Sequence, residues 1–290
     1  MFLTRYLTTM GAPVVGLEDA EGVLRSLGGL DLHELLAEGA ASVAARVAAP
    51  GPVVTDAGTW LPPASGRMEV WACGVTYNRS REARMEESDS ADVYARVYHA
   101  ERPELFFKSV AWRTVTDGEP IGIRDDSALN VPEPEVAVVA DHAGRIVGYT
   151  ICNDVSSRTI EGENPLYLPQ AKVYAGACSL HRRIRLAASL PEPPDFAIRC
   201  TVQRGDALIW QASTSTSAMH RTFVDLLSWA FRADAHPHGL VLSTGTGIVP
   251  EMDLTLAAGD VVTIEVPGLG TLSNVVRVGA GSFPQVLARI

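Results

Sequence analysis

The stretch EPEVAVVADHAGRIVGYTICND, residues 133–154, is the most informative part of this chain. Two apolar runs flank the turn-forming residues Asp-His-Ala-Gly at 141–144, a pattern that predicts a β-hairpin. Side chains two positions apart in a strand point to the same face, so Glu133 and Glu135 are expected to lie side by side. The stretch therefore predicts a pair of carboxylates where the hairpin begins.

The register of this hairpin decides whether a third carboxylate joins the pair. Pairing centred on the turn predicts that Glu133 lies opposite Cys152 and Glu135 opposite Thr150. Asp154 then follows the return strand on the face of Glu133, whereas a shift of one residue would turn it away. Three carboxylates on one face repel each other unless a cation neutralises them, and all-oxygen ligands favour Mg²⁺, Mn²⁺ or Ca²⁺ over zinc. The alternative is an ordinary edge strand with two solvated glutamates.

Many short strands accompany this hairpin, separated by turns rich in Gly, Pro and Asp. They are expected at residues 69–75, 105–109, 197–202, 207–211, 261–266 and 271–278. This pattern favours a sandwich or barrel over a Rossmann sheet. A helix is expected behind the N-cap Thr222, because apolar residues from Phe223 to Ala230 repeat at helical spacing. The polar segment 80–98 is also expected to be helical.

The N-terminal region differs in character from the rest. Helical periodicity is seen over residues 17–27 and 32–47, and a Pro-rich linker follows. We therefore expect a small α/β domain over residues 1–65 and a larger β-rich domain over residues 66–290, an α+β protein overall.

The composition excludes several classes of protein. The chain has 290 residues, with 24 basic and 34 acidic side chains and a formal charge of -10. A hydrophobic content of 47% excludes a disordered chain, and the acid excess argues against nucleic-acid binding. No apolar run approaches the roughly 18 residues of a membrane span, and the N-terminus has no long apolar segment typical of a secretory signal. Four dispersed cysteines without a C-x-x-C pair are typical of buried thiols, so we expect a cytoplasmic protein.

Only two of the 24 basic residues are lysines, Lys108 and Lys172. A codon bias towards arginine explains why lysine is scarce, but not where these two lie. Lys172 follows the apolar, proline-restricted segment 165–171, which favours a buried position. A buried lysine can lose its proton whereas an arginine cannot, so Lys172 near a metal ion is a candidate general base. The alternative is a buried lysine paired to a carboxylate.

Taken together and in order, the motifs over roughly residues 70–278 resemble the fumarylacetoacetate hydrolase superfamily. They are Gly74-Val75-Thr76-Tyr77, Pro103 to Lys108, Glu133-x-Glu135, Asn153 to Arg158, Lys172, Thr244-Gly245-Thr246, Gly259-Asp260 and Gly270 to Asn274. The resemblance implies a mixed β-sandwich roll, Mg²⁺ or Mn²⁺ on Glu133, Glu135 and Asp154, and Lys172 in the active site. It also implies a homodimer or homotetramer.

One position departs from the hydrolases of this family. Those enzymes carry a His three residues after the Tyr of the Gly-x-x-Tyr motif, and this His acts with a Glu to activate water. Here the two positions are Ser80 and Ala83, and a serine without a paired base activates water poorly. Residues 160–172 and 245–250 instead resemble the sugar-acid dehydratase branch, typified by 2-keto-3-deoxy-D-arabinonate dehydratase.

That branch implies a metal-dependent lyase that dehydrates a 2-keto-3-deoxy sugar acid such as 2-keto-3-deoxy-D-arabinonate to 2,5-dioxopentanoate. Lys172 is expected to take a proton from C3. Glu104, beside an apolar run that favours its protonated form, is expected to protonate the departing C4 hydroxyl, ahead of Glu161. The alternative for Glu104 is a solvated residue at a strand start. Expected substrate contacts are Thr246, Glu161, Arg79, Arg81 and Tyr77.

Two other functions remain open at this point. One is a hydrolase or decarboxylase acting on acylpyruvates, fumarylacetoacetate or oxaloacetate, against which Ser80 counts. The other is a non-catalytic metal-binding or scaffold protein that has kept the roll.

Overall fold

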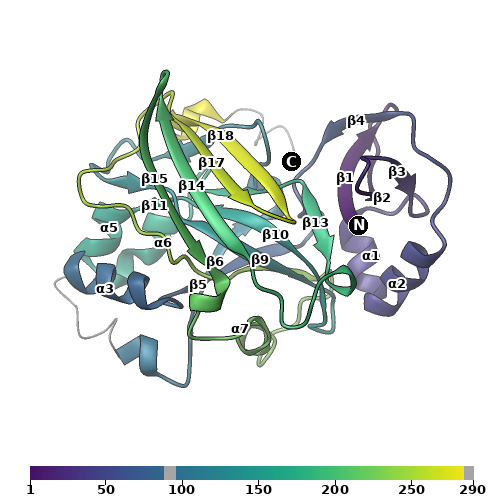
Figure 1. The fold of residues 1–290 in the computed structure, drawn as a ribbon, viewed down its shortest axis with the longest axis horizontal. Coiled ribbons are helices and arrows are strands. Elements are labelled where there is room, and N and C mark those ends of the chain that lie inside the picture. Colours follow the sequence, from purple (N-terminus) through teal and green to yellow (C-terminus); the bar gives the residue numbers. More distant parts are fainter. Residues whose placement is uncertain (88–95, 284–290) are drawn as a thin grey trace.

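The computed structural model describes residues 1–87 and 96–283, which form two β-sheets flanked by short helices (Figure 1). The larger sheet has eleven strands in the order β3-β2-β1-β13-β10-β9-β16-β5-β6, with β12 paired to β10 and β4 to β1. The second sheet has five strands in the order β15-β14-β17-β18-β7, and β8 and β11 form a separate pair. The mixed sandwich expected for the catalytic part is confirmed.

The strands follow one another in runs along the chain, and short helices interrupt them. The strands are β1 (Phe2–Thr8), β2 (Pro13–Glu18), β3 (Leu24–Ser26), β4 (Ala57–Trp60), β5 (Glu69–Gly74), β6 (Glu104–Val110), β7 (Ile121–Ile123), β8 (Asn130–Val131), β9 (Pro134–Ala140), β10 (Ile146–Asp154), β11 (Ser156–Ser157), β12 (Cys178–Leu180), β13 (Arg183–Leu186), β14 (Ala197–Arg204), β15 (Ala207–Ser215), β16 (Leu240–Ser243), β17 (Val261–Val266) and β18 (Gly270–Val278). The α-helices are α1 (Leu32–Glu38), α2 (Ala40–Ala48), α3 (Asn78–Glu87), α5 (Arg158–Glu163), α6 (Leu168–Lys172) and α7 (Phe223–Ala230).

Strand β9 separates two hydrophobic cores, and all seven of its residues are buried. Val136 and Val138 pack into the core between the two sheets, together with residues of the second sheet such as Ile264. Ala137 and Val139 face the other way, into the core beneath α1. Burial on both faces explains why β9 is continuously apolar from Val136 to Ala140 instead of alternating.

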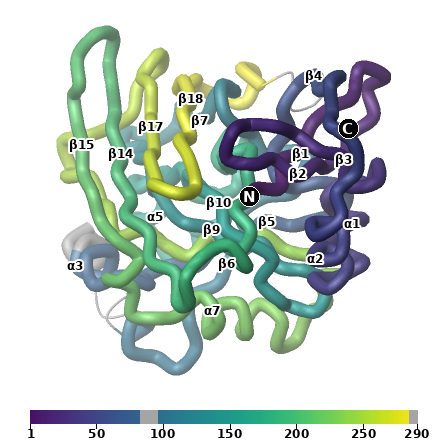
Figure 2. The backbone as a smooth tube through the Cα atoms, turned by 45° about the vertical axis from the view of Figure 1, so that its right-hand side comes forward, coloured from purple at the N-terminus to yellow at the C-terminus, as the bar shows by residue number. Residues whose placement is uncertain are grey.

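The N-terminal strands extend the larger sheet, because β1 pairs with β13, Phe2 lying opposite Arg185. Figures 1 and 2 show β1 to β4 with α1 and α2 gathered at one side of the molecule, and the β14–β15 hairpin at the other. The domain boundary at residue 65 stays a prediction.

Two helix predictions for this region need correction. Residues 17–27 are not helical but end β2 and form β3, because the Asp19 side chain accepts hydrogen bonds from the backbone of Glu21 and Val23 and turns the chain. The helix expected over residues 32–47 is two helices, interrupted at Gly39, whose φ is 91°.

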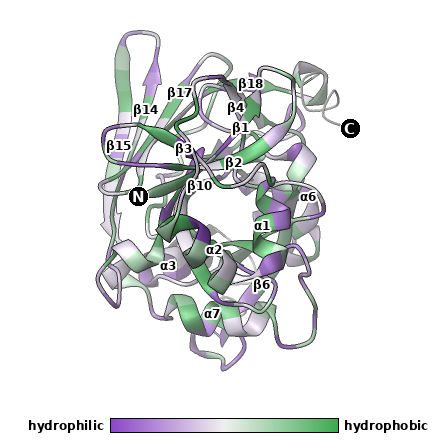
Figure 3. Ribbon diagram, turned by 90° about the vertical axis from the view of Figure 1, so that its right-hand side faces the viewer, coloured by the Kyte–Doolittle hydropathy of each residue, from purple (hydrophilic) through white to green (hydrophobic). Residues whose placement is uncertain are grey.

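The later helices agree better with expectation. Helix α7 begins behind Thr222, whose side chain accepts a hydrogen bond from Asp225 N. Both α1 and α7 carry hydrophobic and hydrophilic residues, as helices with one buried face do (Figure 3). Helix α3 and residues 96–99 are helical within the predicted segment 80–98, and residues 88–95 of that segment lie outside the described residues. No described helix is long and apolar enough to cross a membrane.

The pairing of β9 with β10 differs from the predicted register by two residues. Glu135 lies opposite Cys152, and Asp154 N donates a 3.0 Å hydrogen bond to Glu133 O. One extra residue is in the turn, where Asp141 pairs with Arg145, and the other is in a bulge between Ile146 and Gly148. A shift of two preserves the side-chain faces, so the predicted convergence of carboxylates survives the error.

Candidate active site

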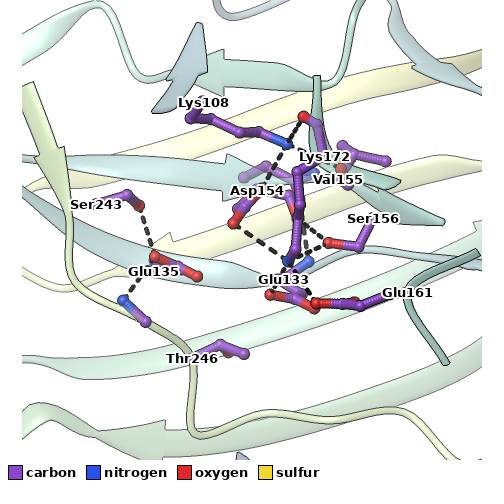
Figure 4. Close-up of polar contacts among 12 residues, drawn as sticks. Lys108, Glu133, Glu135, Asp154, Val155, Ser156, Glu161, Lys172, Ser243 and Thr246 are labelled. Atoms are coloured by element: carbon purple, nitrogen blue, oxygen red, sulfur yellow. Dashed lines mark hydrogen bonds and ion pairs between the residues drawn. The ribbon is translucent and has the colours of Figure 1, made fainter. Parts of the chain in front are cut away.

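Three carboxylates converge where β9 begins and β10 ends. Oxygen atoms of Glu133, Glu135 and Asp154 lie within 4.8 Å of one another, and all three residues are buried. They approach because adjacent strands bring position 133 opposite position 154, and Glu135 follows two residues along on the same face. Figure 4 shows the three side chains directed towards one another.

Glu135 has a half-satisfied carboxylate. Its Oε2 accepts hydrogen bonds from Ser243 Oγ at 2.6 Å and from Gly245 N at 2.7 Å. Its Oε1 is buried and has no hydrogen-bond partner among the described residues. Burial, followed by the negative charges of Asp154 and Glu133, raises the pKa of Glu135 well above its usual range. A hard divalent cation fits this oxygen set, because it would satisfy Oε1 and neutralise the repulsion.

Lys172 ends the short helix α6 and reaches the carboxylates from the side. Its Nζ donates to Glu133 Oε2 at 2.8 Å and to Ser156 Oγ at 2.6 Å, and lies 3.3 Å from Asp154 Oδ2. The side chain is 2% exposed. The expected burial of Lys172 is thus seen, and so is the alternative pairing with carboxylates. The role of this residue as a base remains a prediction.

A cavity beside Lys172 collects other residues expected at the site. It is lined by Cys73, Gly74, Val75, Ser80, Glu104, Phe106, Glu133, Glu161, Lys172, Thr246 and Val249. Glu104 opens β6 and lies opposite Gly74 of β5. A Cβ atom at position 74 would overlap Glu104 Oε2, so only glycine leaves room for this carboxylate. The expected acid therefore shares one cavity with the expected base.

Glu161 and Thr246 also line this cavity. Glu161, on α5, is buried, and its Oε1 lies 3.9 Å from Lys172 Nζ. Thr246 Oγ1 donates to Pro134 O at 2.9 Å and accepts from Ile248 N at 3.1 Å. The hydroxyl thus fixes the loop after β16 against the start of β9.

Three expected substrate contacts do not line this cavity within the described part of the chain: Tyr77, Arg79 and Arg81. Tyr77 is buried beside Gly247, where a Cβ atom would lie 2.6 Å from its ring. Arg79 is exposed on α3. The Arg81 guanidinium lies 5.0 Å from the centre of the Tyr98 ring. Their contacts with substrate remain predictions.

The family of this protein is identified by a match to known sequences, which agrees with the site geometry described above. Residues 69–277 match the family model described as fumarylacetoacetate (FAA) hydrolase C-terminal. The chain belongs to the fumarylacetoacetate hydrolase family. The expected resemblance is confirmed, and the match covers the strands that carry every one of the three convergent carboxylates.

Similar members of the family are sugar-acid dehydratases. The chain is 48% identical over 206 residues to a probable 2-keto-3-deoxyxylonate dehydratase of Haloferax volcanii, covering 71% of each protein. It is 40% identical over 213 residues to 2-dehydro-3-deoxy-D-arabinonate dehydratase of Saccharolobus solfataricus, covering 72% of each. A solved structure of 2-keto-3-deoxy-D-arabinonate dehydratase, complexed with magnesium and 2,5-dioxopentanoate, superposes with a TM-score of 0.80 at 32% identity, covering 96% of this chain and 99% of that one.

Three residues at the site of the present protein were not predicted as site residues from its sequence. Ser156 and Ser243 contact Lys172 and Glu135, respectively. Ser156 lies two positions after Asp154, and that spacing was the available signal. Val75 lines the cavity and has a φ of 54°, a strained value for a β-branched residue. No sequence pattern predicts this backbone conformation.

Proposed function

We propose that the protein is a Mg²⁺-dependent dehydratase of a 2-keto-3-deoxy sugar acid such as 2-keto-3-deoxy-D-arabinonate, giving 2,5-dioxopentanoate. The observation that carries the proposal is a buried carboxylate triad, one member of which, Glu133, lines the same cavity as Lys172 and Glu104. The relatives' dehydratase names and the magnesium in one of their structures support it.

Glu133, Glu135 and Asp154 would hold the ion. When bound, Mg²⁺ or Mn²⁺ supplies Lewis-acid polarisation of a 2-keto acid, which makes the protons on C3 easier to remove. The orphaned Oε1 of Glu135 is the feature that fits this requirement best.

Lys172 then serves as the base. In its neutral form, Nζ accepts a proton from C3 of the substrate. Ser156 Oγ, 2.6 Å from Nζ, fixes where the amine points. The Phe106 ring, whose centre lies 5.5 Å from Nζ, keeps the neighbourhood of the amine apolar on that side.

Glu104 acts as the acid. It protonates the C4 hydroxyl, which leaves as water while the C3 electron pair forms a double bond to C4. Tautomerisation then gives 2,5-dioxopentanoate. Glu161, 3.9 Å from Lys172, is the second candidate for this acid. Thr246, Tyr77, Arg79 and Arg81 remain proposed contacts for the substrate's carboxylate and hydroxyl groups.

A panel of 2-keto-3-deoxy aldonates, incubated with Mg²⁺ and analysed by NMR, tests the proposal. We expect one of them to lose water and yield 2,5-dioxopentanoate or its homologue, and EDTA to stop the reaction. The proposal fails if metal-loaded protein turns over no 2-keto-3-deoxy aldonate.

The hydrolase or decarboxylase alternative lacks support at the cavity. Ser80 lines it, but its hydroxyl donates to Tyr77 O at 2.8 Å, and no histidine lines the cavity within the described residues. Cleavage of an acylpyruvate at a rate comparable to dehydration would revive this alternative.

We further propose that the enzyme is cytoplasmic and forms a homodimer or homotetramer. Light scattering coupled to size-exclusion chromatography distinguishes these assemblies from a monomer.

A further inference from the structure

The second lysine of the chain is buried next to the site, although it does not line the cavity. Lys108 follows Glu104 and Phe106 at two-residue intervals along β6, and its side chain is fully buried. The pairing of β5 with β6 passes from Val70–Ser109 to Trp71–Phe107, which leaves Lys108 as the extra residue of a bulge. Bulges redirect a side chain out of the regular strand pattern.

The ammonium of Lys108 contacts three oxygen atoms. It donates hydrogen bonds to Lys172 O at 2.6 Å and to Val155 O at 3.0 Å, and it forms an ion pair with Asp154 Oδ1, an oxygen that accepts no hydrogen bond among the described residues. The compact ammonium group can face all three oxygens from one nitrogen. Figure 4 shows Lys108 approaching Asp154 and Lys172 from the side away from Glu135.

These contacts tie together two parts of the site that are distant in sequence. Asp154 ends β10, and Lys172 ends α6. Lys108 contacts the carboxylate of Asp154 and donates hydrogen bonds to the carbonyl oxygens of Val155 and Lys172. Its position therefore fixes both a proposed metal ligand and the residue that bears the proposed base.

Lys108 also adds a positive charge to acidic surroundings. Glu133, Glu135, Asp154 and Glu161 are all buried here, and the Lys108 ammonium pairs with Asp154.

Arginine would not serve the same purpose. Its guanidinium spreads its donors over a plane and cannot place three of them on one nitrogen. The chain uses arginine at all but two of its 24 basic positions, and both exceptions lie here. The single-atom geometry of the ammonium accounts for lysine at position 108.

We propose that Lys108 is a positioning residue, which holds Asp154 ready for the divalent ion and aims the Lys172 amine at the substrate. The second half of this inference rests on the dehydratase function proposed above. The first half concerns metal binding and stands without it.

The test is Lys108→Met, which keeps an unbranched side chain one atom shorter than lysine and removes the charge. Titration of the metal-free full-length protein with Mn²⁺, followed by electron paramagnetic resonance, measures the affinity directly. We expect Kd to rise roughly 10–100-fold, as for other residues that orient metal ligands. In the Mg²⁺-saturated enzyme, kcat should fall by a similar factor while KM for the sugar acid changes less than threefold.

Arg183→Met is the matched control. It also removes a cation from a buried carboxylate, Glu18, but lies on β13 away from the cavity. We expect a lower melting temperature and an unchanged Kd for Mn²⁺. If Lys108→Met behaves in the same way, with Kd and kcat within twofold of the wild type, Lys108 has only a structural role and the proposal is wrong.

Lys108→Arg keeps the test decisive if Lys108→Met does not fold. It retains the charge but not the convergent donors, so Kd for Mn²⁺ should still rise severalfold, and a wild-type Kd and kcat would overturn the proposal. The Mn²⁺ titration needs no substrate, so it tests the role of Lys108 in metal binding independently of the proposed function. If the wild-type protein binds Mn²⁺ but dehydrates no sugar acid, the proposed function is wrong, and the titration of the variants still decides the role of Lys108 in metal binding.

Discussion

The amine of Lys172 lies among the carboxylates of Glu133, Asp154 and Glu161, so its charge and its proposed chemistry compete. Nearby negative charges favour the ammonium, whereas a base must be neutral. A divalent ion on the same carboxylates would relieve that preference, because it replaces the lysine as their partner. At the level of single residues, we therefore expect metal binding and activation of the proposed base to occur together.

Lys172→Ala should separate binding from catalysis. We expect kcat to fall by roughly 10²–10⁴-fold, the usual effect of removing a general base, while Mn²⁺ still binds. Circular dichroism and Mn²⁺ titration check that the fold and the metal site persist. Dehydration at more than a tenth of the wild-type rate would exclude Lys172 as the base. If the wild type dehydrates nothing and still binds Mn²⁺, the scaffold alternative gains support.

Gly74→Ala should disturb the proposed acid. The new methyl group would overlap the Glu104 carboxylate and displace it, and misplacement of a reacting group by about 1 Å can cost roughly 10²-fold in rate. Steady-state kinetics of the variant measure the loss. Gly281→Ala is the matched control, because a Cβ atom there meets nothing within 4 Å. If Gly74→Ala and Gly281→Ala have equal kcat and KM, the present position of the Glu104 carboxylate is not required for catalysis.

At the scale of elements, a hydrogen-bonded pair joins the loop before β7 to the residue that follows β12. His181 follows β12, and its Nδ1 lies 2.7 Å from Asp117 Oδ1. Burial tends to raise the pKa of Asp117, but hydrogen bonds and the charge of His181, with Arg182 N, outweigh it and hold the pKa below the ordinary value of 3.8. Because the folded-state pKa is the lower one, the pair stabilises the fold above pH 3.8, and this stability is lost as the pH falls below that value.

Asp117→Asn should therefore change how the free energy of unfolding depends on pH at acidic pH. We expect the variant to be less stable than the wild type at pH 6, and the difference to shrink as the pH falls towards 3. Urea denaturation at a series of pH values measures both curves. A difference that stays constant or grows on acidification would contradict the assignment.

The hairpin of β9 and β10 shows what could be predicted from the sequence and what could not. Its strands and turn were predictable, because their apolar runs and the Gly turn are local features. The register was not, since it depends on a longer turn held by hydrogen bonds from Ala143 N and Arg145 N to Asp141 Oδ1 and on a bulge between Ile146 and Gly148. Ala40 N of α2, from a distant part of the chain, also donates to Asp141. The carboxylate cluster was predicted nonetheless, because an error of two residues leaves each side chain on its face.

Non-local contacts also explain why other predictions were wrong or incomplete. The prediction of a helix over residues 17–27 was wrong because the turn at Asp19 and the pairing of β2 with β1 outweigh helical periodicity. Lys108 could be noticed as a rare residue, but its partners come from β10 and α6, so no local pattern reveals what it holds.

For the whole molecule, metal binding should be visible as stability. An ion that binds only the folded protein, at 100 times its Kd, stabilises the fold by about 2.7 kcal/mol, which corresponds to a rise in Tm of roughly 5–10 °C. Differential scanning calorimetry with Mg²⁺ and with EDTA measures this difference. The control is Glu135→Gln, which should show little rise. An equal Tm with and without Mg²⁺ in the wild type would argue against the triad as a metal site.

The core beneath α1 has a consequence for how the chain unfolds. It contains Leu3 and Leu35 from the N-terminal region together with Val147 from β10, the strand that ends at Asp154. The N-terminal strands cannot detach without uncovering one face of that strand and a free edge at β13. Loss of the N-terminal region and loss of the metal site should therefore occur in one cooperative step, with a single heat-absorption peak and no folded intermediate that has kept its active site.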